Sequence, residues 1–115
     1  MPNVELRDLV INALEDRKGV DIQWRDVQNQ TDNTDYMIVA SGTSGRQVKA
    51  LADSVIEKTA SIDIKPLGLE GMENGEWILI DLTDVVVHVL LPKVREFYDI
   101  ERLWSMSPSK KGFQE

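Results

Sequence analysis

Two aspartates in the C-terminal half of this chain have the type and spacing of metal ligands. Asp81 and Asp84 form a D-x-x-D pattern between two apolar runs. Carboxylates at a strand end can bridge a divalent metal to a triphosphate, as in nucleotidyl-transfer enzymes. Such sites usually alternate along one strand and need a third acid, for which Asp21 and Asp53 are the candidates. This pair straddles a turn, so we favour the alternative that both aspartates stabilise the turn through local backbone hydrogen bonds.

The single histidine, His88, is the side chain expected to titrate near neutral pH. One histidine cannot form a histidine cage around a metal, and no serine or cysteine nucleophile motif accompanies it. Strand alternation places His88 on the same sheet face as Trp77 and Asp81. We therefore interpret it first as a hydrogen-bonded structural histidine, and second as a residue that faces a partner.

A small-residue turn, Gly42-Thr43-Ser44-Gly45, precedes a helical pattern. The free N–H groups of a helix N-terminus can bind an anion. The turn matches neither the P-loop nor the G-x-G-x-x-G motif. We favour a tight turn in which Ser44 or Thr43 caps the helix.

The stretch from Gly75 to Pro92 must position the aspartates and the histidine. It consists of two runs rich in Ile, Val and Leu that are joined by a short polar turn, which is typical of a β-hairpin. One face is predicted to be aliphatic and to belong to the core, through Ile78, Ile80, Leu82, Val85, Val87, Val89 and Leu91. The other face mixes Trp77, Asp81 and His88 with aliphatic neighbours. Hairpin turns usually place Gly or Asn where φ is positive, so Thr83 leaves the turn type open.

The remaining elements follow from the periodicity of apolar residues. Helices are predicted at about 4–18 and 46–60, and strands at 20–27, 36–40 and 67–69. We expect Asn3 to cap the first helix and Gly19 to end it. One helix or two short helices should follow Pro92. The prediction is an α/β (α+β) fold with a mixed β-sheet flanked by helices, in a single domain at 1–104 with a flexible C-terminal tail at 105–115.

Composition narrows the function classes. The 115 residues include no cysteine, which excludes disulfides and thiolate catalysis, and they carry a net charge of −7. An acidic domain is repelled by phosphate backbones, so direct DNA binding is not expected. No signal peptide and no apolar run of the ~20 residues needed for a membrane helix is visible, which predicts a soluble, cytoplasmic protein. The acidity suits a basic protein partner, although it could equally serve solubility.

Several motifs, in order, resemble one known family. They are Gly75-Glu-Trp-Ile-Leu-Ile-Asp-Leu-Thr-Asp-Val-Val-Val-His-Val-Leu90, Arg95-x-Phe-Tyr-x-x-Glu101-x-Leu-Trp104, Asp35-Tyr-Met-Ile-Val-Ala-Ser-Gly-Thr-Ser44, Arg46-Gln-Val48, Ala52-Asp53 and Leu67-Gly-Leu-Glu-Gly71. Over about residues 4 to 104 the chain resembles the ribosomal silencing factor family, also called RsfS or Iojap-related. Thr83 departs from the glycine usual in this family between the two aspartates.

The resemblance implies a fold related to nucleotidyltransferases without their catalytic acids, and a protein that is not an enzyme and uses no cofactor. It implies binding to the large ribosomal subunit through ribosomal protein fourteen, which blocks association with the small subunit and represses translation. A role in large-subunit maturation and a homodimer are also implied.

The mixed face of the hairpin and the segment after it supply the expected contact residues. These are Trp77, Asp81, His88, Leu90, Arg95 and Tyr98, with Asp84 and Glu101 in addition. The alternatives are a metal-dependent nucleotidyltransferase-like enzyme and a homodimer that uses this face only for its own interface.

Overall fold

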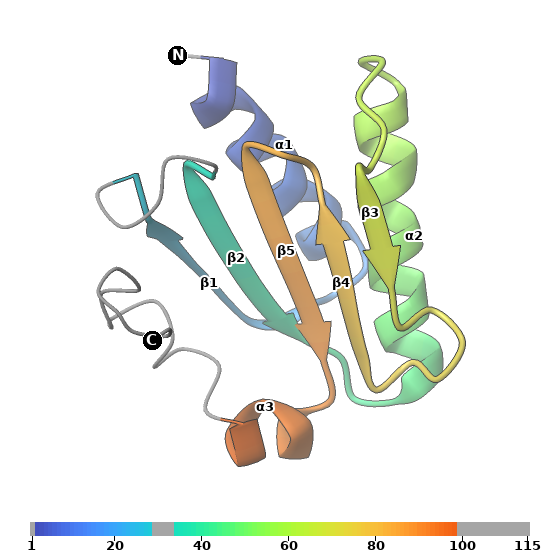
Figure 1. Ribbon diagram of the computed structural model, residues 1–115. Helices are drawn as coiled ribbons and strands as arrows, with labels where there is room; N and C mark the ends of the chain where they lie inside the picture. Colours follow the sequence, from blue (N-terminus) through green and yellow to red (C-terminus); the bar gives the residue numbers. More distant parts are fainter. Residues whose placement is uncertain (1, 29–33, 99–115) are drawn as a thin grey trace.

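The computed structural model describes residues 2–28 and 34–98 (Figure 1). Its elements, in order, are α1 (Pro2–Asp16), β1 (Val20–Asp26), β2 (Tyr36–Ser41), α2 (Gly45–Ala60), β3 (Gly68–Glu70), β4 (Trp77–Asp81), β5 (Val85–Leu90) and α3 (Pro92–Tyr98). The expected tail at 105–115 lies outside the described residues, and the domain boundary at 104 stays a prediction.

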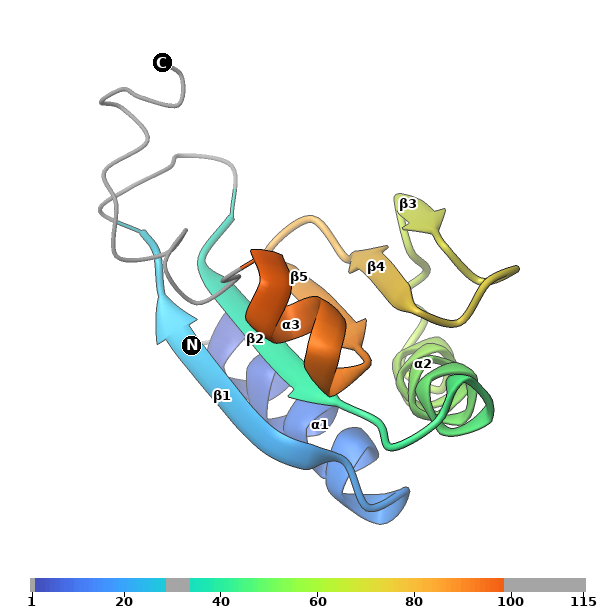
Figure 2. The same ribbon diagram turned by 90° about the horizontal axis from the view of Figure 1, so that it is seen from below.

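The strands form one mixed sheet in the order β1-β2-β5-β4-β3. β2 and β5 run parallel, and the other neighbouring strands are antiparallel. Helices α1 and α2 cover one face of the sheet, and α3 lies on the other side, beyond the end of β5 (Figure 2). The predicted mixed sheet with flanking helices is confirmed. Its relation to nucleotidyltransferases stays a prediction.

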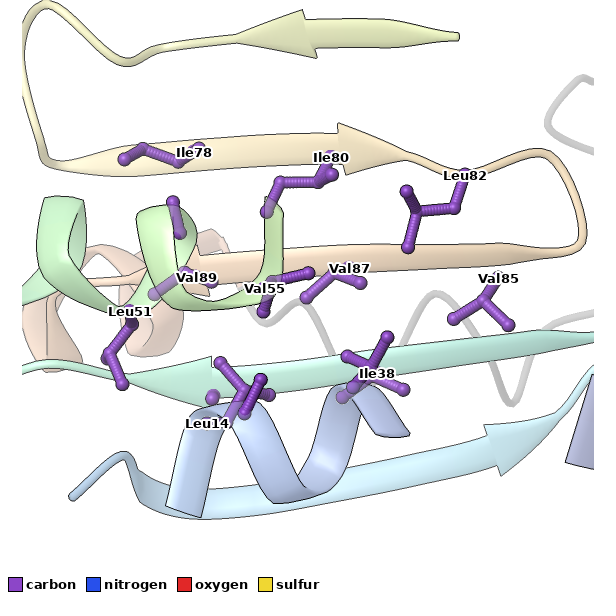
Figure 3. Packing of buried hydrophobic residues seen from close by; sticks show 14 of the residues in the cluster. Leu14, Ile38, Leu51, Val55, Ile78, Ile80, Leu82, Val85, Val87 and Val89 are labelled. Atoms are coloured by element: carbon purple, nitrogen blue, oxygen red, sulfur yellow. The ribbon is translucent and has the colours of Figure 1, made fainter. Parts of the chain in front are cut away.

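The aliphatic face of the β4–β5 hairpin is the centre of the core. Its side chains from Ile78 to Val89 are buried against α1 and α2, as predicted from alternation, and Leu91 is partly buried against the same core. Figure 3 shows the hairpin residues together with Leu14 of α1 and Leu51 and Val55 of α2. Burying one such side chain stabilises the fold by roughly 1.5–3 kcal/mol, so this face accounts for a large part of the stability.

The first helix differs from the prediction at both ends. It begins at Pro2 and not after Asn3, because proline is well tolerated at the first helical position. It ends at Asp16. Lys18, with φ of 62°, takes a left-handed conformation at this end, directly before Gly19, which we expected to end the helix. Gly19 N then donates to the carbonyl oxygen of Leu14 at 2.8 Å, which closes the helix end.

The hairpin turn places Thr83 at a φ of 75°. Thr83 is the first of the two residues between Leu82 and Val85, and a positive φ at that position is characteristic of turns that take glycine there. Asp81 Oδ1 accepts a hydrogen bond from Thr83 N at 2.8 Å, which confirms for this aspartate the turn-stabilising role. A β-branched residue in this conformation is strained.

We therefore expect Thr83→Gly to raise the free energy of unfolding by up to ~1 kcal/mol, because the left-handed strain removed exceeds the flexibility that glycine adds to the unfolded chain. Urea unfolding measures the change. Thr83→Ala is the control, since it keeps a Cβ at the same φ. Equal stability of the two variants would contradict the explanation.

Candidate functional site

The face of the sheet opposite α1 and α2, here called the open face, carries the candidate site. Its residues are Met37, Val39 and Ser41 of β2, Val86, His88 and Leu90 of β5, and Trp77, Leu79 and Asp81 of β4. A small apolar cluster of Val27, Val39 and Leu90 extends along β2 on this face, and Met37, Trp77 and Val94 of α3 pack against it. The open face is therefore covered at the end of β5 and accessible along β4.

Trp77 and His88 form the centre of the open face. Trp77 Nε1 donates a hydrogen bond to His88 Nδ1 at 3.0 Å. The hairpin register brings them together, because Trp77 pairs with Leu90, two residues beyond His88. Tyr98 of α3 lies against the indole, with ring centroids 5.1 Å apart. The indole is thus held from two sides while it remains half-buried.

His88 is only 9% exposed, and burial lowers its pKa from 6.5 to about 4. It is therefore neutral at physiological pH. Because Nδ1 accepts from the indole, the ring proton resides on Nε2. The prediction of a hydrogen-bonded structural histidine is confirmed.

Arg95 fixes α3 to the sheet. Its side chain is buried, and Nη1 donates to Ser41 Oγ at 2.9 Å. Nη2 lies 3.7 Å from Asp21 Oδ2, on the part of β1 where the pairing with β2 is irregular and Asp21 has a φ of 51°. Arg95 was expected to contact a partner directly. The structure instead gives it internal contacts that position Tyr98 over Trp77.

The remaining expected contact residues differ in accessibility. Leu90 is fully buried, so its expected role as a direct contact is wrong: alternation put it on the open face, but α3 covers it. Tyr98 is 55% exposed, and Asp81 and Asp84 are partly exposed near the hairpin turn. Glu101 lies outside the described residues.

Two further apolar residues of this region, which were not among the contacts expected from the sequence, are accessible. Phe97, next to Tyr98 in α3, is 80% exposed, and the two rings meet edge to face at a centroid distance of 4.9 Å. Leu79 is partly exposed between Trp77 and Asp81. Strand alternation already placed Leu79 on the open face, whereas no local signal indicates which side of α3 is exposed.

A pocket of about 320 Å³ lies on the open face at β3 and β4. It is lined by Glu70, Gly71, Trp77, Leu79 and His88. The side chains of Trp77 and Leu79 supply its apolar surface. The carboxylate of Glu70 and the imidazole of His88 supply its polar groups. Pockets with few polar groups in an apolar wall are typical of specific recognition.

The four aspartates considered as metal ligands do not converge. Asp21 lies near the strand ends that hold Ser41 and Leu90, whereas Asp81 pairs with Val86 at the far end of β5. Asp53 is on α2, behind the other face of the sheet. Within residues 2–28 and 34–98, no group of three or more His, Cys, Asp or Glu residues could hold a metal ion.

The turn at residues 42–45 is a helix cap. Ser44 Oγ accepts from Gln47 N at 3.1 Å, and Gln47 Oε1 accepts from Thr43 N and Oγ1 at 2.6 and 2.8 Å. The first bond satisfies one free N–H group of the helix N-terminus, and the other two connect the preceding turn to the first turn of the helix. The favoured interpretation, with Ser44 as the cap, is confirmed.

Comparison with known proteins decides the family. Residues 2–115 match the family described as "Ribosomal silencing factor during starvation". The chain belongs to the ribosomal silencing factor family. The resemblance seen in the sequence motifs is thereby confirmed.

Relatives within the family extend from bacteria to organelles. The chain is 54% identical over 100 residues to "Ribosomal silencing factor RsfS" of Chromobacterium violaceum, covering 87% of this chain and 82% of the relative. It is 28% identical over 102 residues to the mouse "Mitochondrial assembly of ribosomal large subunit protein 1", covering 86% of this chain and 45% of that protein.

Two solved structures superpose closely on the fold of this chain. A crystal structure of a Chromobacterium violaceum protein superposes with a TM-score of 0.89 at 52% identity, covering 91% of this chain and 88% of that one. A Bacillus halodurans protein superposes at 0.80 and 35% identity, covering 87% and 93%. Among the described residues, the helices are too short or too polar to cross a membrane.

Proposed function

We propose that this chain binds the large ribosomal subunit through ribosomal protein fourteen and sterically blocks association with the small subunit. It would thereby repress translation in the cytoplasm without catalysing a reaction. Membership of the silencing-factor family supports the role, and the name of the mouse relative supports a link to large-subunit assembly. The net charge of −7 suits a basic protein surface on the ribosome.

The observation that carries the proposal is the preorganised aromatic centre of the open face. Trp77 is held by the His88 hydrogen bond and by Tyr98, and the exposed Phe97 extends the aromatic surface. Large aromatics held in one conformation lose little entropy on binding, and they dominate the energetics of protein interfaces. Steric occlusion by a bound protein needs no further chemistry.

Cosedimentation with purified subunits tests the proposal. The protein should pellet with the large subunit, and adding the small subunit should then yield fewer joined particles. A protein that pellets with neither subunit would refute the binding role, and normal joining in the presence of bound protein would refute the blocking role. A homodimer formed through the open face would compete with this binding, which mass measurement with and without the large subunit would detect.

Trp77→Ala should weaken binding to the large subunit by about 2 kcal/mol, because the largest anchor of the open face is lost. Trp24→Ala is the matched control. Trp24 is 45% exposed, but it pairs with Ile38 on the helix-covered side and lies 4.2 Å below the guanidinium of Arg7. Its replacement should leave the affinity unchanged. Circular dichroism confirms that both variants fold, and equal affinities would remove Trp77 from the interface.

A further inference from the structure

A hydrogen-bond donor without an acceptor among the described residues lies in the wall of the open-face pocket. The pocket is lined by Glu70, Gly71, Trp77, Leu79 and His88. His88 is 91% buried and its Nδ1 is occupied by Trp77, so the proton is on Nε2. No group within the described residues accepts a hydrogen bond from this Nε2–H. Buried polar groups are nearly always paired with protein or water, so a donor in a pocket wall that no described residue accepts is available to an acceptor of a ligand.

A hydrogen-bond acceptor is present at the rim of the same pocket. Glu70, the last residue of β3, pairs with Leu79 and is exposed. Within the described residues its carboxylate forms no ion pair. The pocket therefore offers one donor, from a neutral imidazole, and one acceptor, from a carboxylate. Between them lie the apolar surfaces of Trp77 and Leu79.

This arrangement discriminates between charged and neutral side chains, and among neutral ones it favours separate donor and acceptor atoms over a single hydroxyl, because Glu70 and His88 are on strands separated by β4. A lysine or arginine could pair with Glu70, but it has no acceptor for the His88 N–H. A carboxylate could accept from His88, but Glu70 would repel it. A carboxamide carries an acceptor oxygen and a donor nitrogen, and its methylene groups can lie on Trp77 and Leu79. The pocket volume of about 320 Å³ admits such a side chain.

We propose that the pocket takes an asparagine or glutamine side chain of the ribosomal partner. Its carbonyl oxygen accepts from His88 Nε2–H, and its NH₂ group donates to Glu70. This inference rests on the proposed function, because the partner is the large ribosomal subunit. It assigns His88 a specificity-determining contact in addition to its internal bond with Trp77.

Affinity for purified large subunits, measured for paired variants, tests the proposal. His88→Leu should bind about tenfold more weakly, whereas His88→Gln should stay within about threefold of the wild type, because its amide can accept from Trp77 and still donate. Glu70→Ala should also lose about tenfold, and Glu70→Gln should stay within about threefold, since a neutral donor needs only an acceptor oxygen. Glu73→Ala, an exposed charge outside the pocket, should bind like the wild type.

The possible outcomes separate the hypotheses. If His88→Leu binds as tightly as His88→Gln, no acceptor occupies the pocket and the inference fails. If Glu70→Gln loses as much affinity as Glu70→Ala, and binding becomes less salt-dependent in both, the occupant is a cation and the inference also fails. If the wild type binds no large subunit, the proposed function falls, and this inference with it. Should His88→Leu not fold, the exposed Glu70 pair decides the question.

Discussion

Replacing Gly71 with alanine should lower the free energy of unfolding by about 3 kcal/mol, because both the backbone conformation and the available space exclude a side chain. Gly71 follows β3 and has a φ of 89°. A Cβ at this position would overlap the carbonyl oxygen of Trp77 and lie 3.0 Å from the carbonyl carbon of Trp77 and 3.3 Å from Ile78 Cα. These are backbone atoms of β4, so relief requires the strand itself to move.

Gly68→Ala is the matched control for this prediction. Gly68 is the first residue of β3, and its φ is not positive. A Cβ there would meet Asp81 Cβ at 3.7 Å, which is ordinary van der Waals contact. We expect its free energy of unfolding to change by less than about 0.5 kcal/mol. Guanidinium unfolding followed by fluorescence compares the two variants. Equal losses of unfolding free energy would show that any substitution in or next to β3 is destabilising, and would contradict the explanation for Gly71.

Gly71→Ala should also weaken ribosome binding. Gly71 lines the pocket that Trp77 and His88 share, and the clash is with the Trp77 backbone. A shift of β4 would therefore disturb the bond between the indole and the imidazole. Gly71→Ala should bind large subunits more weakly than Gly68→Ala even at a temperature where both are folded.

Local pattern was sufficient to predict the hairpin and its two faces. Alternation over residues 77–90 places each side chain on one face, and burial of the aliphatic face follows from composition alone. The same alternation put Trp77 and His88 on one face, which made their contact foreseeable. The short strand beside the hairpin was also predictable, one residue away from its observed position at Gly68–Glu70.

Contacts between distant segments could not be predicted in this way. The bond of Arg95 to Ser41 spans 54 residues and depends on the parallel pairing of β2 with β5. No periodicity in the sequence specifies that pairing. Leu90 was assigned wrongly for the same reason, since its burial depends on where α3 packs. Thr83 shows a third limit, because tertiary context imposes a φ that its residue type disfavours.

Acidification should destabilise the protein through His88 by about 3 kcal/mol between pH 6.5 and pH 4. The pKa of His88 is lowered from 6.5 to about 4 by its burial between the strands. Between pH 6.5 and pH 4, His88 is protonated in the unfolded chain but stays mostly neutral in the folded chain. The stabilisation is therefore complete above pH 6.5 and is lost progressively as the pH falls towards 4. Glu70 is the charged residue that shares the pocket with the imidazole.

His88→Gln isolates this contribution, because the variant retains every carboxylate and lacks only the titrating ring. The unfolding free energy of both proteins should be measured by urea titration from pH 7.5 to 4. The wild-type curve should fall more steeply below pH 6.5, by up to ~1.4 kcal/mol per pH unit. Parallel curves would show that His88 keeps an ordinary pKa, and hence that it is not desolvated as the structure has it. Protonation would also place a second N–H against the indole donor of Trp77, so the hydrogen bond that orients this anchor requires the neutral ring.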